Sequence, residues 1–380
     1  MRQKNNINIL IITSFQTYEP RAEAIRNYFE KKDKSVWIIS TNFAHREKKN
    51  RSDQKDGYSF IATESYKRNL SLSRLISHYN FARDAFSEAE FFWPELLYVL
   101  IPANILVKFA QNYKHRKKCK LVIDIVDMWP ESLPVSKIKN YWPFTLWRNL
   151  RNDYLYMSDA IITECDLYQQ LIPLDKIERP IQTVYWPQVT YMCNIDSCPN
   201  MNIVRFLYLG SINNIIDIDE IIVILLKIKS IRPVELHIIG NGERWKFFKI
   251  ALDKAQIPYF FWGIVYEHNT IQSIANQCHF GINIMKTTVC IGITMKSVSY
   301  LEMGLPILNN LKSDIGNLIE KYHCGFNVYS TSGLKSIDII KEYGMDWRKN
   351  ARIVYETYFS EDAIHSQLET IIDNVYCHVE

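Results

Sequence analysis

Short apolar runs rich in isoleucine, leucine and valine alternate with longer stretches of helical periodicity along the first half of the chain. Strands are predicted at 7–12, 36–40, 121–126 and 160–163, and helices at 19–32 and 70–86. In the second of these helices, Leu72, Leu75, Ile76 and Tyr79 recur at helical spacing. Such alternation is typical of a mostly parallel sheet with helices on both faces.

The same pattern restarts after residue 200. Strands are predicted at 204–209, 234–239, 260–262, 280–284 and 306–308, with helices at 220–228, 243–255 and 294–303. The segment 186–200 between the halves is polar and irregular, as in a linker. The length of 380 residues also agrees with two domains. We therefore predict an α/β chain of two doubly wound Rossmann-like domains, with a ligand in the cleft between them.

The predicted domain boundaries follow from this pattern. The first domain is predicted at 1–187, the linker at 188–202 and the second domain at 203–355. The remaining segment, 356–380, is predicted to be a helix that packs back toward the first domain.

One apolar stretch, 91–110, approaches the length of a membrane span, but prolines at 94 and 102 interrupt it. We interpret it as a buried strand, a turn at Pro94 and a core helix. The basic cluster 114–120 that follows is either a solvated surface or a contact with anionic lipid headgroups.

Composition narrows the functional classes. The chain is 47% hydrophobic and 23% charged, which excludes a disordered polymer, and its net charge of +4 is too small to indicate nucleic-acid binding. Its eight cysteines lack metal-ligand or disulfide-like spacing, so we expect reduced thiols in a cytoplasmic protein. Of the 12 glycines, 11 follow residue 200, so close backbone contact with a phosphate is expected only in the second half.

Glycine-bearing turns follow three predicted strands of the second half. Gly210 with Ser211, then Gly240, then Gly263 stand at the strand ends where parallel sheets bind nucleotides. A single turn of this kind also serves any tight strand-to-helix connection. Three turns on successive strands are stronger evidence for a nucleotide site.

A fourth glycine, Gly292, precedes the helix predicted to start near Thr294. The free amides and dipole of a helix N-terminus favour a diphosphate there. Lys296 in the first turn and Lys286 after the preceding strand would add positive charge. The alternative is that Gly292 forms an ordinary turn and the lysines lie on the surface.

The first half offers a carboxylate at a strand end. Asp127 follows the strand predicted at 121–126 and could orient a sugar hydroxyl or accept its proton. Trp129 could stack on a sugar ring or fill the core. Asp124 points to the other side by strand alternation and ranks lower.

Metal and hydrolase motifs are weak. Asp217 and Asp219 form a D-x-D, but they stand just before a predicted helix, where N-capping is the simpler interpretation. The sequence has no H-E-x-x-H, no P-loop and no G-x-S-x-G, which argues against a metalloprotease, a P-loop ATPase and a serine hydrolase.

Several of these motifs, in this order along the chain, resemble those of the GT-B glycosyltransferases, in particular the large family four of nucleotide-sugar enzymes. Segment 127–132 resembles the D-[LM]-W-P-E-S motif of members that build bacterial surface polysaccharides, and 296–306 resembles K-x-x-E-Y-L-x-x-G-x-P. Segments 208–211 and 239–243 and the turn at Gly263 resemble the family's donor-domain turns.

The resemblance implies a GT-B architecture and transfer of a hexosyl or related sugar from a nucleotide-diphosphate donor to a saccharide, often lipid-linked, for capsule, exopolysaccharide or other surface glycan. Donor binding is then assigned to Gly210, Ser211, Gly240, Gly263, Lys286, Gly292, Thr294, Lys296 and Glu302. Asp127 is the expected catalytic residue, and Trp129, Glu131 and Arg21 are expected to bind the acceptor. No metal, other cofactor or nucleic acid is expected. Peripheral contact with the inner membrane face is expected through 114–120.

The sequence departs from the family pattern at the donor site. The family's pair of glutamates in E-x7-E falls on Ile291 and Ser299, which leaves Glu302 as the nearest substitute, and 14–21 replaces the first-domain glycine loop. These departures leave open a non-catalytic GT-B partner subunit that binds glycan or stabilises a transferase. A GT-B epimerase is less favoured, because the match at 127–132 is to transferases.

Overall fold

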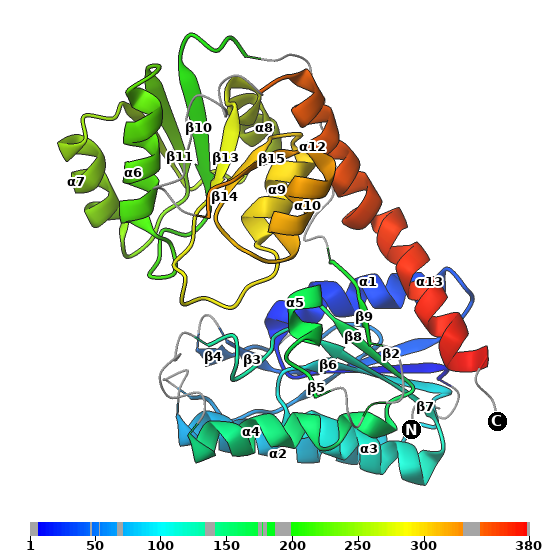
Figure 1. Cartoon of the computed structure of the whole chain (residues 1–380). Coiled ribbons are helices and arrows are strands. Elements are labelled where there is room, and N and C mark those ends of the chain that lie inside the picture. The colour runs from blue at the N-terminus through cyan, green and yellow to red at the C-terminus, as the bar shows by residue number, and fades with distance from the viewer. Residues whose placement is uncertain are drawn as a thin grey trace. The chain divides into compact units, whose positions relative to one another are not determined.

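The chain folds into two compact units in the computed structural model (Figure 1). The first unit comprises Met1–Trp186 and His365–Glu380, and the second comprises Pro187–Ile364. The structure describes residues 7–45, 48–52, 54–66, 71–133, 141–173, 177, 181–186, 199–329 and 343–377.

A seven-stranded parallel sheet, ordered β5-β2-β1-β6-β7-β8-β9, forms the core of the first unit. Its strands are β1 (Ile9–Thr13), β2 (Val36–Thr41), β5 (Tyr58–Ile61), β6 (Leu96–Ile101), β7 (Lys120–Ile125), β8 (Ala160–Thr163) and β9 (Ile181–Thr183). A small antiparallel pair, β3 (Phe43–Ala44) with β4 (Lys49–Asn50), follows β2. Every residue of β1 and β6 is buried, because helices cover both sheet faces and strands there read as continuous apolar runs.

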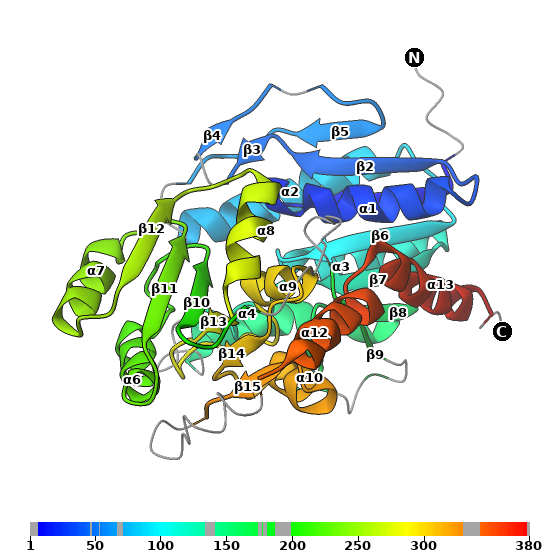
Figure 2. The ribbon, with the colours of Figure 1, turned by 90° about the horizontal axis from the view of Figure 1, so that it is seen from above.

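Helices cover the two faces of this sheet unequally. The helical segments are η1 (Gln16–Tyr18), α1 (Glu19–Glu30), α2 (Leu72–Ala89), α3 (Ile105–Lys117), α4 (Trp142–Asn152), η2 (Leu155–Met157) and α5 (Asp166–Gln169). Figures 1 and 2 show α2, α3 and α4 on one face and α1 on the other. The last helix, α13 (Glu361–Cys377), packs beside α1, where Lys32 pairs with Glu369 at 2.6 Å.

The second unit has a six-stranded parallel sheet ordered β12-β11-β10-β13-β14-β15. Its strands are β10 (Val204–Leu209), β11 (Val234–Ile239), β12 (Tyr259–Gly263), β13 (Phe280–Asn283), β14 (Ile307–Asn309) and β15 (Gly325–Asn327). Its helices are α6 (Ile218–Lys229), α7 (Trp245–Lys254), α8 (His268–Gln277), α9 (Met295–Glu302), α10 (Asp314–Tyr322) and α12 (Met345–Tyr358).

The strand order reverses once in each sheet, between β1 and β6 and between β10 and β13. In doubly wound folds, ligands bind outside the carboxyl ends of the strands at such a reversal. We call the carboxyl end of the first sheet, where β7 and β8 end, the first edge. The corresponding end of the second sheet, where β10 and β13 end, is the second edge.

The predicted α/β class with two doubly wound sheets is confirmed, and each strand and helix predicted above overlaps an observed element. The interpretation of 91–110 needs a correction. The strand β6 begins after Pro94 rather than before it, and α3 begins after a second turn at Pro102. None of the helices in the described part of the chain is long and apolar enough to cross a bilayer.

The apolar stripe of α2 is a second difference from expectation. Leu72, Ile76 and Tyr79, which predicted this helix, are 78%, 55% and 50% exposed. The helix instead buries the face that carries His78 and Phe81 against the rest of the unit.

The basic cluster 114–120 is largely paired with acids on the surface of the first unit. Lys114 bonds Asp159 at 2.6 Å, and Lys117 lies 3.2 Å from a carboxylate oxygen of Glu90. Arg116 also pairs with Glu90. Most of the positive charge of the cluster is therefore neutralised within the protein.

Candidate functional site

The glycine turns of the second unit interlock at the second edge. The amide of Gly210 donates to the carbonyl of Ile239 at 2.9 Å, and that of Gly240 donates to the carbonyl of Gly263 at 2.6 Å. Gly210 and Gly240 have φ of +112° and +137°, which side chains of L-residues rarely allow. A Cβ on Gly240 would also overlap the carbonyl oxygen of Gly210. These glycines thus allow three neighbouring strand ends to approach closely.

Lys296 extends from the first turn of α9 toward this region. Its Nζ lies 3.4 Å from the hydroxyl of Tyr208 and 4.5 Å from the centre of that ring. The Tyr208 hydroxyl in turn donates to the carbonyl of Ser211 at 2.8 Å. Among the described residues, no carboxylate lies within ion-pair distance of Lys296, and burial lowers its pKa to about 7. The second edge therefore holds a partly buried amine with no acidic partner among the described residues.

Thr294 connects the end of β13 to the start of α9. Its Oγ1 accepts from the amide of Ser297 at 3.2 Å, which caps the helix, and donates to Oδ1 of Asn283 at 2.8 Å. Since Asn283 ends β13, the helix N-terminus is fixed at the second edge. Its first-turn amides and its positive dipole end are the features that favour an anion.

Gly292 and Lys286 lie in the connection between β13 and α9. The carbonyl of Gly292 accepts from the hydroxyl of Ser313 at 2.9 Å and from the amide of Ile315 at 3.2 Å, so it is tied to the start of α10. Lys286 is partly exposed, and its backbone amide donates to the carbonyl of Ile215 at 2.9 Å.

Glu302 lies apart from the other predicted donor residues. It is the last residue of α9, six positions after Lys296, which places it about 9 Å further along the helix axis. Its side chain is buried, and its carbonyl accepts from Arg352 of α12 at 2.7 Å.

The D-x-D motif serves helix capping. The carboxylate of Asp217 accepts from the amide of Glu220 at 3.1 Å at the start of α6, which confirms that interpretation. In the described parts of both units, no cluster of three or more His, Cys, Asp or Glu side chains is arranged to hold a metal ion.

At the first edge, Asp127 accepts a short hydrogen bond from the hydroxyl of Tyr18. Burial raises the pKa of Asp127, while the Tyr18 bond and the charge of Arg74 act in the opposite direction. Burial and the neighbouring Asp127 raise the pKa of Tyr18 well above its ordinary value, so the phenol remains a hydrogen-bond donor at neutral pH.

Glu164 is a second carboxylate at this edge that the sequence analysis missed. It directly follows β8, and its amide donates to the carbonyl of Ile125 at the end of β7. Burial, with a smaller contribution from Asp127 and Asp124, raises its pKa to about 8. Its position immediately after a predicted strand, like that of Asp127, is the signal that could have identified it.

Arg21 is engaged in a buried ion pair. Its Nε lies 2.9 Å from Asp124, which is fully buried and also accepts from the hydroxyl of Tyr98 at 2.9 Å. The guanidinium lies 4.6 Å from the ring centre of Trp186. These contacts hold the Arg21 side chain in place without a ligand.

Glu131 is also neutralised within the protein. It accepts from Nε of Arg148 and from Nη2 of Arg151, each at 2.8 Å, and both Glu131 and Arg151 are buried. Burial lowers the pKa of Arg151, and Glu131 opposes that change.

Trp129 lies at the centre of an aromatic cluster beside Asp127. Its ring is stacked on that of His78, with centroids 6.3 Å apart and planes 12° apart. The guanidinium of Arg74 lies 4.0 Å from the Trp129 ring centre, and Phe15 meets the ring edge-on. Asp127 and Trp129 thus share one environment at the first edge, whereas Arg21 and Glu131 are held in ion pairs.

No family model and no curated protein matches the sequence. Solved structures do match its fold over nearly the whole chain. A lipopolysaccharide outer core galactosyltransferase, WaaB, is 13% identical with a TM-score of 0.65, and the match covers 97% of this chain and 99% of that one. HepE of Anabaena, solved with UDP and glucose, is 10% identical with a TM-score of 0.61 and coverage of 97% and 100%.

Sucrose-phosphate synthase of Thermosynechococcus elongatus matches with a TM-score of 0.67 at 10% identity, covering 98% of this chain and all of that one. These proteins are GT-B glycosyltransferases, so the chain has the GT-B fold that the sequence motifs indicated. At such low identity, the likeness concerns the fold alone.

Proposed function

We propose that this protein is a glycosyltransferase that moves a hexosyl or related sugar from a nucleotide-diphosphate donor to a saccharide acceptor. The second edge binds the donor, and the first edge binds the acceptor. The observation that carries this proposal is Lys296, a partly buried amine without an acidic partner in the described structure, beside the N-terminus of α9 and the Gly210 turn. A buried cation in that setting is stabilised by an anion such as a diphosphate.

The chemistry follows from charge development. The acceptor oxygen forms a new bond to the anomeric carbon of the sugar, and the bond from that carbon to the diphosphate breaks. The departing diphosphate gains negative charge, which Lys296 and the first amides of α9 stabilise. Asp127 takes the proton that the acceptor hydroxyl loses. Burial raises the pKa of Asp127 and makes its carboxylate a stronger base, while Tyr18 holds one of its oxygens in place. The protein supplies the cationic groups itself, so the reaction proceeds without a metal ion.

The finer features of the proposal concern the pathway. The motif at 127–132 favours capsule, exopolysaccharide or another surface glycan, with a lipid-linked acceptor and a cytoplasmic enzyme. Membrane contact through 114–120 would depend mainly on Lys118 and His115, which are exposed, because the neighbouring cations pair with Glu90 and Asp159. Flotation with anionic vesicles, compared with neutral vesicles, tests that contact.

Replacing Lys296 with alanine tests the donor site. Loss of one charge-assisted contact is expected to weaken binding of the preferred nucleotide sugar by about 1–3 kcal/mol, or roughly 5- to 150-fold. Calorimetry with a panel of UDP-, GDP-, ADP- and dTDP-sugars measures it. Lys246→Ala on α7 is the matched control, and equal affinities for wild type and Lys296→Ala would contradict the assignment.

A non-catalytic partner subunit is the second candidate, and Ile291 and Ser299 at the positions of the family's glutamates favour it. Incubation of the purified protein with the same panel separates the two functions. Slow donor hydrolysis supports a transferase, whereas no binding and no turnover with any donor supports the partner subunit.

A further inference from the structure

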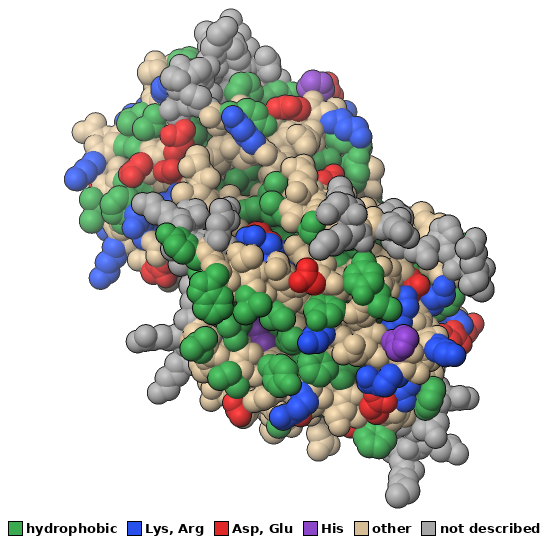
Figure 3. Space-filling model, turned by 60° about the horizontal axis from the view of Figure 1, so that its bottom comes forward, with side chains coloured by type: hydrophobic (Ala, Val, Ile, Leu, Met, Phe, Trp, Pro, Cys, Tyr) green, Lys and Arg blue, Asp and Glu red, His purple; other side chains and the backbone are tan. Residues whose placement is uncertain are grey.

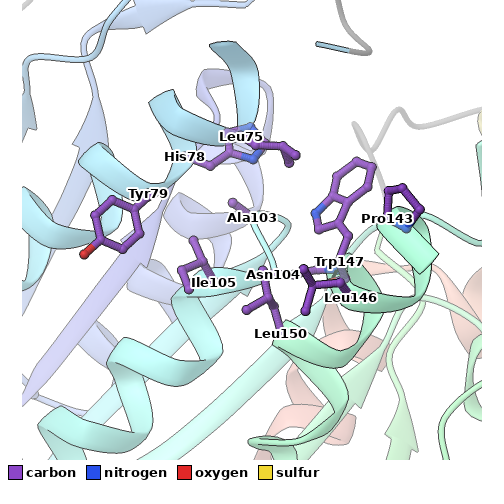
Figure 4. A pocket seen from close by; sticks show the side chains of 10 residues that line it. All are labelled: Leu75, His78, Tyr79, Ala103, Asn104, Ile105, Pro143, Leu146, Trp147 and Leu150. Carbon is purple, nitrogen blue, oxygen red and sulfur yellow. Dashed lines mark hydrogen bonds between the residues drawn. The ribbon is translucent and has the colours of Figure 1, made fainter. Parts of the chain in front are cut away.

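A cavity opens between α2 and α4, on the side of the first unit that these helices share with α3 (Figure 4). Its volume is about 140 Å³, close to that of an engineered apolar cavity that binds benzene. Its walls are apolar side chains of three helices, and its floor includes two polar residues. The lining residues are Leu75, His78, Tyr79, Ala103, Asn104, Ile105, Pro143, Leu146, Trp147 and Leu150.

Exposed apolar side chains surround the cavity mouth. On α2, Leu72 and Ile76 point outward, and on α4, Trp142 and Leu146 are 74% and 55% exposed. Figure 3 shows hydrophobic side chains gathered on this face of the first unit. A contiguous apolar patch of this kind marks a binding surface, because exposing it to water is otherwise unfavourable.

Two buried polar groups of the cavity have hydrogen-bonding atoms with no partner in the described structure. His78 is 5% exposed and neither ring nitrogen is hydrogen-bonded; Asn104 is fully buried and its Oδ1 accepts nothing. Burial lowers the pKa of His78 well below its ordinary value, so the ring is neutral and offers one donor and one acceptor. Leaving such groups unsatisfied is costly, so a ligand hydroxyl, which both donates and accepts, matches the floor.

Residues that line the cavity also contact the first edge. His78 stacks on Trp129, and the amide of Asn104 donates to the carbonyls of Trp129 and Trp147, each at 2.9 Å. The cavity and the first edge are therefore neighbouring sites, where one amphiphile would place its apolar end and its polar end. A protein partner bound to the exposed apolar side chains would not require contact between the cavity and Trp129.

We propose that the cavity and its apolar rim bind the hydrocarbon chain of an amphiphilic acceptor, with a hydroxyl next to the chain donating to Oδ1 of Asn104 and accepting from the N–H of His78. The inference rests on the proposed function, since it places the glycosyl acceptor at the first edge. It places the hydrocarbon chain of the acceptor on the face formed by α2 and α4, and not at the basic cluster 114–120.

Binding of β-maltosides to the full-length protein, without nucleotide, tests the proposal. Methyl, hexyl, octyl and decyl β-maltoside share one headgroup, and each is used below its critical micelle concentration. The affinity, followed by tryptophan fluorescence, is expected to rise about fourfold per methylene until the groove is filled. Affinity that does not depend on chain length would overturn the proposal.

Substitutions test which residues bind the alkyl maltosides. Ile76→Asp combined with Leu146→Asp, both at exposed rim positions, should weaken decyl maltoside binding at least tenfold, whereas Val223→Asp on the exposed face of α6 should not change it. His78→Phe keeps the aromatic stack and removes the ring nitrogens. It should weaken all four maltosides by a similar factor and leave the increment per methylene unchanged.

Two outcomes would assign the face to a different occupant and overturn the proposal. One is rim-dependent binding to neutral phosphatidylcholine vesicles without binding of any monomeric maltoside, which indicates a bilayer surface. The other is rim-dependent dimerisation without maltoside binding, which indicates a second copy of the chain. Calorimetry of the same samples with nucleotide sugars shows separately whether the proposed transferase function fails.

Discussion

The two edges differ in how their charges are satisfied. At the first edge, Arg21 is paired with Asp124 and Glu131 with two arginines, so these charges are neutralised inside the protein. At the second edge, Lys296 meets only the hydroxyl and ring of Tyr208 among the described residues. A charge that is paired within the protein holds the fold in place and is not available to a ligand. A buried charge without an internal partner can bind a ligand of opposite charge. On this comparison we propose that the second edge binds the anion.

The largest expected effect comes from breaking an ion pair of the first edge. Arg21→Met leaves the fully buried Asp124 with only Tyr98 as a partner among the described residues and is expected to lower the free energy of unfolding by about 3–5 kcal/mol. Urea denaturation measures this. Adding Asp124→Leu should recover most of the loss, because no uncompensated buried charge remains. A fully stable Arg21→Met protein would mean that Arg21 is available to the acceptor.

The glycine turns of the second edge can be compared with each other. Both Gly210 and Gly240 have positive φ, but only at Gly240 would a new Cβ strike backbone. Gly240→Ala is expected to cost about 3 kcal/mol or more, and Gly210→Ala about 1–2 kcal/mol. Thermal denaturation of the two variants measures the difference, and equal losses would refute the close packing of the turns.

Glu164 offers a smaller test at the first edge. Its folded pKa of about 8 is above its ordinary value of 4.5, so the unfolded state binds fewer protons between pH 4.5 and 8. Stability from this group is therefore complete below pH 4.5 and is lost as pH rises through 8. Glu164→Gln should gain about 1–3 kcal/mol relative to wild type between pH 5 and 8.5, measured by denaturation at both values. If the difference in free energy of unfolding between the variant and wild type is the same at both pH values, the Glu164 side chain is solvated in the folded protein.

The sequence predicted the fold well where local pattern determines structure. Strands β10 and β11 have the predicted bounds because each is a mostly apolar segment between turns. The strands β5, β9 and β15 have no counterpart in the prediction, because a polar residue or glycine interrupts each of them, unlike the equally short β8. Periodicity predicts the helix α2 but not which of its sides packs on the sheet, so the exposure of its apolar stripe could not be predicted.

The candidate site was predicted in part, for a related reason. The glycine turns and the α9 N-terminus follow strand ends, so their location could be predicted from order along the chain. The Arg21–Asp124 pair joins residues 103 positions apart, and no local pattern reveals such a contact. Likewise, His78 reaches Trp129 only through the packing of α2 on the first edge.

The pH dependence of donor binding tests the central claim most directly. Lys296 has a pKa of about 7 in the free protein, and a bound diphosphate favours its charged form, so affinity is full below pH 7 and falls as pH rises above it. Calorimetry with the nucleotide sugar that binds best should show about tenfold weaker binding at pH 8 than at pH 6. Lys296→Arg, which stays charged, should remove this dependence. The same pH dependence in both proteins, or no binding to any nucleotide sugar, would contradict the account.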